Sequence, residues 1–236
     1  MSRTLVLGDP HGNIKGMLQC FERSKFDYEK DTLIVLGDIC DGFPYVKQVI
    51  DELLKVKDCL IVLGNHDAWA MEWYDREDPY HNATPDRWWY DQGGRATMES
   101  YDNKAMPKEH LKFLQSNYPY IVDKKNNLYV HGGINPSKPA QDQSLDTLTW
   151  DRDLIRVARH KHSQKPKYKY GGYNKIFIGH TTTQSYGTTK PLFFCNVINL
   201  DTGAGWSGPM TIMDRDTLEY WQSDLPKDLY DIQGRS

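Results

Sequence analysis

The sequence lacks the segments that mark an exported or membrane-spanning chain. No charged-then-apolar leader follows Met1, and no apolar run approaches the ~18 residues that a membrane helix needs. The four cysteines show no paired metal-finger spacing, and most of them adjoin apolar runs, so we expect reduced thiols rather than disulfides. These absences predict a cytoplasmic protein with no membrane partner.

The sequence also lacks a large excess of positive or negative charge. The chain has 29 Lys and Arg against 32 Asp and Glu, which gives a formal net charge of −3. A nucleic-acid binder usually carries a basic surplus, so no dedicated nucleic-acid surface is predicted. A small phosphorylated substrate stays possible, because bound metal ions can supply positive charge locally. The length of 236 residues suits one α/β domain over 1–236, and no internal repeat is present.

What the sequence does contain is five short apolar runs, each followed at once by polar residues of metal-binding type. The runs end at Gly8-Asp9-Pro10-His11, Gly37-Asp38, Gly64-Asn65-His66-Asp67, His131-Gly132-Gly133 and Gly179-His180. Each run is continuous rather than alternating, which is typical of a strand buried on both faces. We therefore expect five strands with polar residues at their carboxyl ends.

Helical patterns fill several gaps between these strands. Apolar residues at helical spacing predict helices from about Ile14 to Arg23 and from about Tyr45 to Val56. Strand, ligand loop, helix and strand in succession predict a layered α/β fold. In open α/β sheets, chemistry gathers beyond the carboxyl ends of the strands. We therefore expect the five polar motifs to meet at one sheet edge.

Three other segments follow different patterns. Residues 69–120 are rich in aromatics and are interpreted as a helical insertion, with a helix at Lys108–Gln115. After about Phe193, strands are expected at Phe194–Leu200, Met210–Met213 and Leu218–Trp221, as antiparallel strands of a second sheet. The basic segment Arg156–Tyr170 is interpreted as an exposed loop that could attract an anionic substrate, although a charge run is more often a solvated face.

The polar motifs offer a set of ligands for two divalent metal ions. Carboxylate oxygen suits hard cations, and Mn²⁺, Fe²⁺ and Zn²⁺ also accept imidazole. Asp38 could bridge the two ions. A metal pair lowers the pKa of a bridging water, and the resulting hydroxide can attack phosphorus. The sequence thus predicts a phosphoester hydrolase whose candidate metal ligands are Asp9, His11, Asp38, Asn65, His131 and His180.

The leaving group of such a reaction needs a proton. His66 is placed to donate it, with Asp41 holding its imidazole and the adjacent Asp67 as a rival for that role. Taken singly, an Asp, Asn or His after a strand is more often a turn residue or a helix cap. Five such motifs in compatible order have no economical structural explanation, and this favours the catalytic interpretation.

These motifs resemble those of the calcineurin-like metallophosphoesterase superfamily, especially the small prokaryotic and phage serine/threonine phosphatases of the lambda phage type. Trp150-Asp151-Arg152-Asp153 and Asn199-Leu200-Asp201-Thr202-Gly203 also resemble segments of that group. The resemblance implies a β-sandwich of mixed sheets flanked by helices and two metal ions, most often Mn²⁺, with Fe or Zn as alternatives. It implies that Asp9, His11 and Asp38 hold the first ion, that Asp38, Asn65, His131 and His180 hold the second, and that Arg152 and Asn65 contact the phosphate.

The chain departs from the family pattern at two positions. Gly42 stands where these phosphatases usually carry a phosphate-binding arginine, and Asp67 stands where glutamate is more usual. Arg95, in the insertion, could replace the missing arginine, but a solvated surface arginine is the more ordinary interpretation. These departures weaken protein-phosphatase specificity without affecting the prediction of a hydrolase.

Three functions therefore remain open on the sequence alone. The first is a phosphomonoesterase acting on phosphoserine, phosphothreonine or phosphotyrosine. The second is a hydrolase of dinucleoside polyphosphates or other nucleotides, and the third is an inactive binding module, which the complete ligand set disfavours. The tryptophans at 69, 73, 88 and 89 could stack a nucleobase or a phosphotyrosine ring, although packing of the insertion onto the core is the more common role for such residues.

Overall fold

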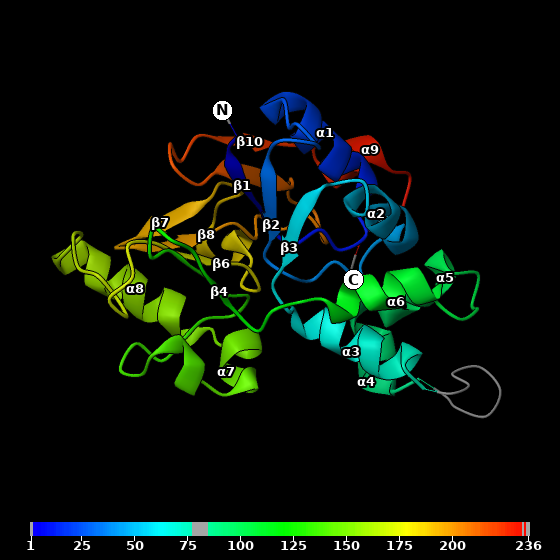
Figure 1. Cartoon of the computed structure of the whole chain (residues 1–236), viewed down its shortest axis with the longest axis horizontal. Helices are drawn as coiled ribbons and strands as arrows, with labels where there is room; N and C mark the ends of the chain where they lie inside the picture. Colours follow the sequence, from blue (N-terminus) through cyan, green and yellow to red (C-terminus); the bar gives the residue numbers. More distant parts are fainter. Residues whose placement is uncertain (1, 77–84, 233, 235–236) are drawn as a thin grey trace.

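Two mixed β-sheets lie at the centre of the protein (Figure 1). The computed structural model describes residues 2–76, 85–232 and 234. The first sheet has the strand order β10-β9-β1-β2-β3, and the second has the order β4-β5-β6-β8-β7. Both sheets mix parallel and antiparallel pairs, as the predicted β-sandwich of mixed sheets requires.

The first sheet is built from the predicted apolar runs and from two later strands. β1, β2 and β3 are parallel, β9 is antiparallel to β1, and β10 is antiparallel to β9. The bounds are β1 Thr4–Leu7, β2 Thr32–Val35, β3 Asp58–Ile61, β9 Thr211–Asp214 and β10 Tyr220–Gln222.

The second sheet contains the remaining strands. β5, β6 and β8 run parallel, and β4 and β7 pair antiparallel at its two edges. The bounds are β4 Ile121–Val122, β5 Leu128–Tyr129, β6 Ile176–Ile178, β7 Leu192–Phe194 and β8 Val197–Asn199.

Alternating side chains of each inner strand enter two different apolar clusters. In β1, Leu5 and Leu7 pack with the helices outside the first sheet, whereas Val6 packs between the sheets. Tyr129 and Phe177 of the second sheet stack in the same inter-sheet cluster, with ring centroids 5.1 Å apart. Strands buried on both faces explain why the runs are continuously apolar.

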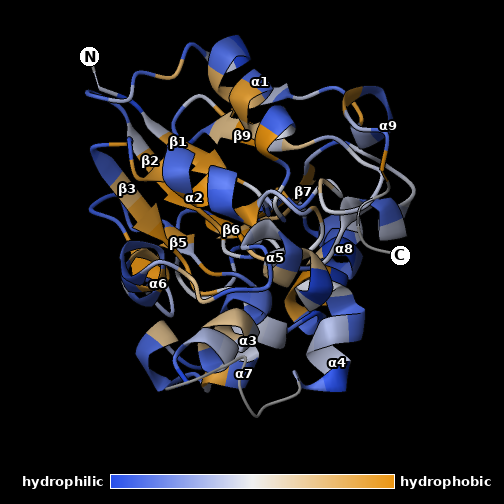
Figure 2. Ribbon diagram, turned by 90° about the vertical axis from the view of Figure 1, so that its right-hand side faces the viewer, coloured by the Kyte–Doolittle hydropathy of each residue, from blue (hydrophilic) through white to orange (hydrophobic). Residues whose placement is uncertain are grey.

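Helices cover the outer face of each sheet, which gives four layers. α1 (Ile14–Ser24) and α2 (Val46–Leu53) cover the first sheet, and α7 (Leu145–Trp150) and α8 (Asp153–Gln164) cover the second. Figure 2 shows largely hydrophobic strands inside and hydrophilic residues on the outer helices. Short elements complete this part of the fold, namely the 3₁₀ turns Ala140–Asp142 and Thr183–Tyr186 and the helix α9 (Pro226–Leu229).

The predicted insertion is mostly helical where the structure describes it, and its residues 77–84 lie outside the described residues. It contains most of α3 (Asn65–Tyr74), then α4 (Arg87–Trp89), a π-helical turn at Tyr90–Gly94, α5 (Arg95–Ser100) and α6 (Lys108–Gln115). These helices lie together beside α2 and β3 (Figure 1). The bounds of α6 agree with the prediction.

Three predictions about the fold were wrong. The five ligand motifs do not share one sheet edge, because β1, β2 and β3 belong to one sheet and β5 and β6 to the other. β9 and β10 extend the first sheet rather than the second. The strand expected at Phe194–Leu200 is present in the second sheet as the shorter β8, which follows a turn at Cys195 and Asn196 and pairs antiparallel with β7. The basic segment expected as a loop is largely α8, whose buried Leu154, Ile155 and Ala158 face the second sheet.

No helix among the described residues is long and apolar enough to cross a membrane. The four cysteines are free thiols, and Cys20 and Cys40 are buried.

Candidate metal centre and active site

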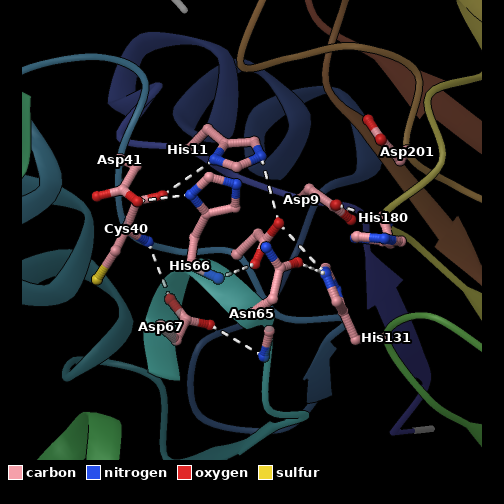
Figure 3. Close-up of polar contacts among 12 residues, drawn as sticks. Asp9, His11, Cys40, Asp41, Asn65, His66, Asp67, His131, His180 and Asp201 are labelled. Atoms are coloured by element: carbon pink, nitrogen blue, oxygen red, sulfur yellow. Dashed lines mark hydrogen bonds and ion pairs between the residues drawn. The ribbon is translucent and has the colours of Figure 1, made fainter. Parts of the chain in front are cut away.

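The six predicted metal ligands lie together in one buried site, just after the ends of β1, β2, β3, β5 and β6. Figure 3 labels all of them except Asp38. Asp9, His11 and Asp38 form one group of donor atoms within 4.8 Å of one another, and Asp38, His131 and His180 form a second such group. Asp38 Oδ2 lies between the two groups, 3.6 Å from His11 Nε2 and 3.2 Å from His131 Nε2. This carboxylate is therefore in position to bridge two cations.

Backbone carbonyls orient two of the histidines. His11 Nδ1 lies 2.9 Å from the carbonyl oxygen of Cys40, and His131 Nδ1 lies 2.7 Å from that of Leu36. A carbonyl can only accept, so each Nδ1 donates its proton to the backbone and each ring turns its Nε2 toward the site. Asn65, the first residue of α3, places its Oδ1 3.1 Å from His131 Nε2.

The backbone at the strand ends is unusual in a way that turns these side chains inward. His11, Asp38 and His180 have positive φ angles of 45°, 50° and 63°. Such angles are uncommon for residues other than glycine and concentrate at functional sites. Gly64 and Gly179 are needed beside them, because a Cβ at either position would lie within 2.2 Å of an oxygen of Asp38 or Asp9.

The electrostatics of the site favour bound cations. Burial and the nearby Asp201 carboxylate raise the pKa of Asp9 well above its usual value. Burial would lower the pKa of His131, but Asp38 raises it to about 10, so the carboxylates draw positive charge into the site. Burial lowers the pKa of His180 to about 2, which keeps its imidazole neutral and able to act as a ligand.

Two buried polar atoms of the site have no hydrogen-bond partner among the residues that the structure describes. They are Asp9 Oδ1 and His180 Nε2. An unpaired buried carboxylate oxygen or imidazole nitrogen is costly, and a metal ion would satisfy both kinds of atom. The mixed oxygen and nitrogen donors fit divalent ions such as Mn²⁺, Fe²⁺ or Zn²⁺.

His66 lies beside this cluster and makes a close pair with Asp41. His66 Nδ1 is 2.5 Å from Asp41 Oδ2, and both side chains are almost fully buried (Figure 3). The His66 backbone N–H donates to Asp38 Oδ1 at 3.0 Å, which ties the pair to the metal centre. Asp67 is not the partner of His66, because its carboxylate accepts from the backbone N–H groups of Ile39 and Cys40.

The insertion holds Asp41 in place through Thr97, which the sequence did not indicate, and through Trp89, for which only packing or ring stacking was considered. Trp89 Nε1 donates to Asp41 Oδ2 at 3.1 Å, and Thr97 Oγ1 donates to Asp41 Oδ1 at 2.6 Å. The Thr97 hydroxyl also accepts from the Asp41 backbone N–H at 2.8 Å. Nothing in the local sequence marks these residues, because the contact joins positions 48 and 56 residues apart.

The absence of an arginine at position 42 has a local explanation. Gly42 has a φ of +86°, and a Cβ there would lie 2.8 Å from the carbonyl oxygen of His11. A side chain at this position therefore conflicts with the conformation of a predicted metal ligand. Arg95 does not replace the missing arginine, since it is exposed and pairs with Glu99 at 2.7 Å. The more ordinary interpretation of Arg95, a solvated surface arginine, is confirmed.

Arg152 lies at the mouth of the site, immediately before α8. Its Nη1 donates to the His180 carbonyl oxygen at 3.2 Å and to Thr181 Oγ1 at 3.3 Å. Arg152 lines the same cavity as His66 and Asp38. Asp201, which the sequence analysis noted but gave no role, lines this cavity too and is buried near Asp9.

Tryptophans surround the cavity, but they are not the set considered from the sequence. Trp69 and Trp88 line it, whereas Trp73 and Trp89 are buried in the core of the insertion. Trp150 and Trp206, from distant parts of the chain, line it as well. The packing role therefore holds for two of the four tryptophans considered.

Comparison with known proteins agrees with this geometry. Residues 2–204 match the model of the calcineurin-like phosphoesterase family. The chain belongs to this family. It is a metal-dependent phosphoester hydrolase, as members of the family use two metal ions and the donor groups for them are present.

Two curated relatives carry different names. Serine/threonine-protein phosphatase 2 of Salmonella typhimurium is 25% identical over 210 residues, which cover 87% of this chain and 89% of the relative. The symmetrical bis(5'-nucleosyl)-tetraphosphatase of Pseudomonas fluorescens is 25% identical over an alignment that covers 94% of this chain and 96% of the relative. The structure of a protein serine/threonine phosphatase from Saccharomyces cerevisiae superimposes with a TM-score of 0.58, at 15% identity, over 99% of this chain and 83% of that one. The two curated relatives are thus named for different substrates, and the likeness to the solved structure concerns the fold.

Proposed function

We propose that this chain is a phosphomonoesterase of the serine/threonine protein phosphatase type, with His66 as the general acid. The observation that carries the proposal is the buried His66–Asp41 pair, 2.5 Å apart, at the edge of the metal-ligand cluster. A proton donor beside a metal pair is the arrangement that departure of an alkoxide from phosphorus requires.

We assign the metal ligands as the sequence analysis predicted. Asp9, His11 and Asp38 would hold one ion, and Asp38, Asn65, His131 and His180 the other. The donor distances and the two unpartnered buried atoms support this assignment, and the mixed donors favour Mn²⁺, with Fe and Zn as alternatives. When bound, the ions supply Lewis acidity and an activated water.

The protein groups around the ions then have defined tasks. Asp41 accepts a hydrogen bond from His66 Nδ1 and so directs the opposite nitrogen, Nε2, toward the leaving oxygen. Donation of the Nε2 proton releases the alcohol in place of an alkoxide. Arg152 and the amide of Asn65, which both line the cavity, would bind the non-bridging phosphate oxygens.

The test is turnover of a phosphoserine peptide by the Mn²⁺-loaded protein and by its His66→Asn variant. We expect the variant to keep its metal content and to lose roughly 10²- to 10⁴-fold in kcat. p-Nitrophenyl phosphate should lose less, because its leaving group is stable without a proton. His160→Asn, at an exposed position of α8, is the matched control and should behave like the wild type. Unchanged kcat in His66→Asn would remove His66 from the mechanism.

A second candidate function is hydrolysis of dinucleoside polyphosphates or other nucleotides. Gly42 favours it, because the arginine typical of phosphoprotein phosphatases is absent there. A panel of p-nitrophenyl phosphate, phosphopeptides and diadenosine tetraphosphate with Mn²⁺ separates the two candidates. Faster turnover of the tetraphosphate would replace the first proposal with the second.

Two broader expectations belong to the same proposal. We infer that residues 1–236 act as a single catalytic domain, which the shared apolar cluster between the two sheets supports. We also infer a reducing, cytoplasmic location, which the four free thiols support.

A further inference from the structure

Indole rings make up much of the cavity wall beside the proposed acid. Trp69, Trp88, Trp150 and Trp206 all line the cavity, and Trp88 is 64% exposed. A phosphoryl group is recognised by cations and hydrogen-bond donors, so the metal site by itself does not require these rings. An exposed aromatic surface at the mouth of a site instead suits an apolar, flat part of a substrate.

The rings form a continuous series from the proposed acid to a metal ligand. The ring centroid of Trp69 lies 5.0 Å from that of His66, and Trp150 lies 5.1 Å from Trp69. Trp150 in turn lies 5.5 Å from His180. A group leaving from the phosphorus toward His66 would therefore move along an indole surface.

The position of Trp69 restricts what the leaving group can be. The leaving oxygen must come within about 2.6–3.2 Å of His66 to take its proton. Whatever is bonded to that oxygen then begins next to Trp69. In an aryl ester this group is the ring itself, whereas in a nucleoside 5'-phosphate a sugar lies between the oxygen and the base.

The size of the cavity points in the same direction. Its volume is about 190 Å³, which is below the roughly 300–1,000 Å³ of pockets that enclose drug-sized ligands. A phosphoryl group with one adjoining ring suits this space better than a dinucleotide does.

We propose that Trp69, Trp88 and Trp150 form a subsite for an aromatic ring bonded directly to the scissile oxygen, so that phosphotyrosyl groups are the preferred substrate class. The proposal rests on the proposed function, because His66 sets where the leaving oxygen lies. Offset or edge-to-face contacts with the indoles would hold the ring.

Binding of phosphonates tests the subsite without chemistry. Phenylphosphonate and cyclohexylphosphonate have similar size, but only the first is flat. Calorimetry with the Mn²⁺-loaded full chain should give a Kd for phenylphosphonate at least fivefold lower, and Trp69→Leu and Trp88→Ala should each reduce that ratio toward one. Trp221→Leu is the control, since Trp221 is partly buried against the same core cluster as Trp69 but does not line the cavity.

Kinetics completes the test. We expect Trp88→Ala to lose roughly 5- to 100-fold in kcat/KM on a phosphotyrosine peptide and to lose less on the matched phosphoserine peptide. Equal phosphonate affinities overturn the subsite, and so does a nucleoside 5'-monophosphate that is hydrolysed faster than the phosphotyrosine peptide. If both peptides are hydrolysed alike by wild type and variants, the subsite fails and the proposed function stands. If no phosphoester is hydrolysed with any divalent metal, both fail.

Discussion

Thr97 offers a sharp test of how the insertion supports the active site. Its side chain is fully buried, donates to Asp41 Oδ1 at 2.6 Å and accepts from the Asp41 backbone N–H at 2.8 Å. Valine has nearly the same shape but no hydroxyl. The Thr97→Val substitution therefore removes both hydrogen bonds while it keeps the packing of α5.

The expected cost follows from the two bonds. A hydrogen bond to a charged group contributes about 1.5–3 kcal/mol, and a buried N–H that loses its acceptor costs about 1–3 kcal/mol. The free energy of unfolding should thus fall by roughly 2.5–6 kcal/mol, which corresponds to a Tm lower by roughly 5–24 °C in a chain of this size. Because Asp41 orients His66, kcat on a phosphoserine peptide should also fall by roughly 10- to 100-fold, as when an outer partner of a functional histidine is lost.

Scanning calorimetry and the pH–rate profile measure these two effects separately. Thr211→Val is the matched control, because Thr211, in β9, is also buried, its hydroxyl bonds Thr202 and Gln222, and it does not line the cavity. The control should lose stability and keep its kcat and pH profile. Wild-type kcat and pH profile in Thr97→Val would refute the positioning role of Thr97, and so would an equal loss of kcat in the control.

Three further predictions follow from other parts of the structure. Gly42→Ala should lower the free energy of unfolding by more than Gly187→Ala does in urea titrations. Both glycines have positive φ, which costs an alanine about 1–2 kcal/mol at either position, but only the Cβ at position 42 would also contact His11. Equal losses would show that the contact with His11 is relieved. Removal of divalent metal by a chelator should lower Tm, since an ion at 100 times its Kd stabilises the folded state by about 2.7 kcal/mol; a Tm that does not depend on Mn²⁺ concentration would contradict the metal assignment. Burial would raise the pKa of Asp31, but hydrogen bonds from Arg3 outweigh it and hold this pKa below the ordinary value of 3.8 in the folded state. The ionised Asp31 carboxylate therefore stabilises the fold fully above pH 3.8, and this stabilisation is lost as the pH falls below 3.8. Asp31→Asn should therefore lose less stability than the wild type between pH 6 and pH 3, and equal losses in urea titrations would contradict this.

The parts of the fold that depend on local sequence could be predicted. α1 was expected from Ile14 to Arg23 and extends one residue further, to Ser24, where Lys25 adopts the left-handed conformation that ends it. The Asn13 side chain caps its first turn by accepting from the Gly16 N–H. Residues that immediately follow a strand were also placed correctly, because the direction of the strand determines where they lie.

The pairing of strands could not be predicted, because it depends on contacts between distant segments. β6 and β8 look alike in the sequence, and only their tertiary contacts place β6 beside β5 and β8 beside β6 in the second sheet. The meeting of ligands from two sheets at one site also depends on contacts between distant segments. A single sheet and a sandwich present the same order of strands and loops along the chain.

The helix α8 was missed for a different reason. Its apolar residues are few, and basic residues between them gave the segment the composition of a solvated loop. A usable signal was present, since Leu154, Ile155 and Ala158 lie at helical spacing and the Asp151 carboxylate accepts from the Leu154 N–H at the helix start. The basic residues of this segment therefore obscured a narrow stripe of buried apolar side chains.

The insertion connects the two main inferences, because it contributes to both catalysis and recognition. Trp89 and Thr97 hold the carboxylate that orients His66, while Trp69 and Trp88 line the cavity where the leaving group would lie. A change that shifts α4 relative to α3 would move both sets of residues at once. Variation in this segment should therefore change kcat and the preference between aryl and alkyl esters together, even where all six proposed metal ligands are kept.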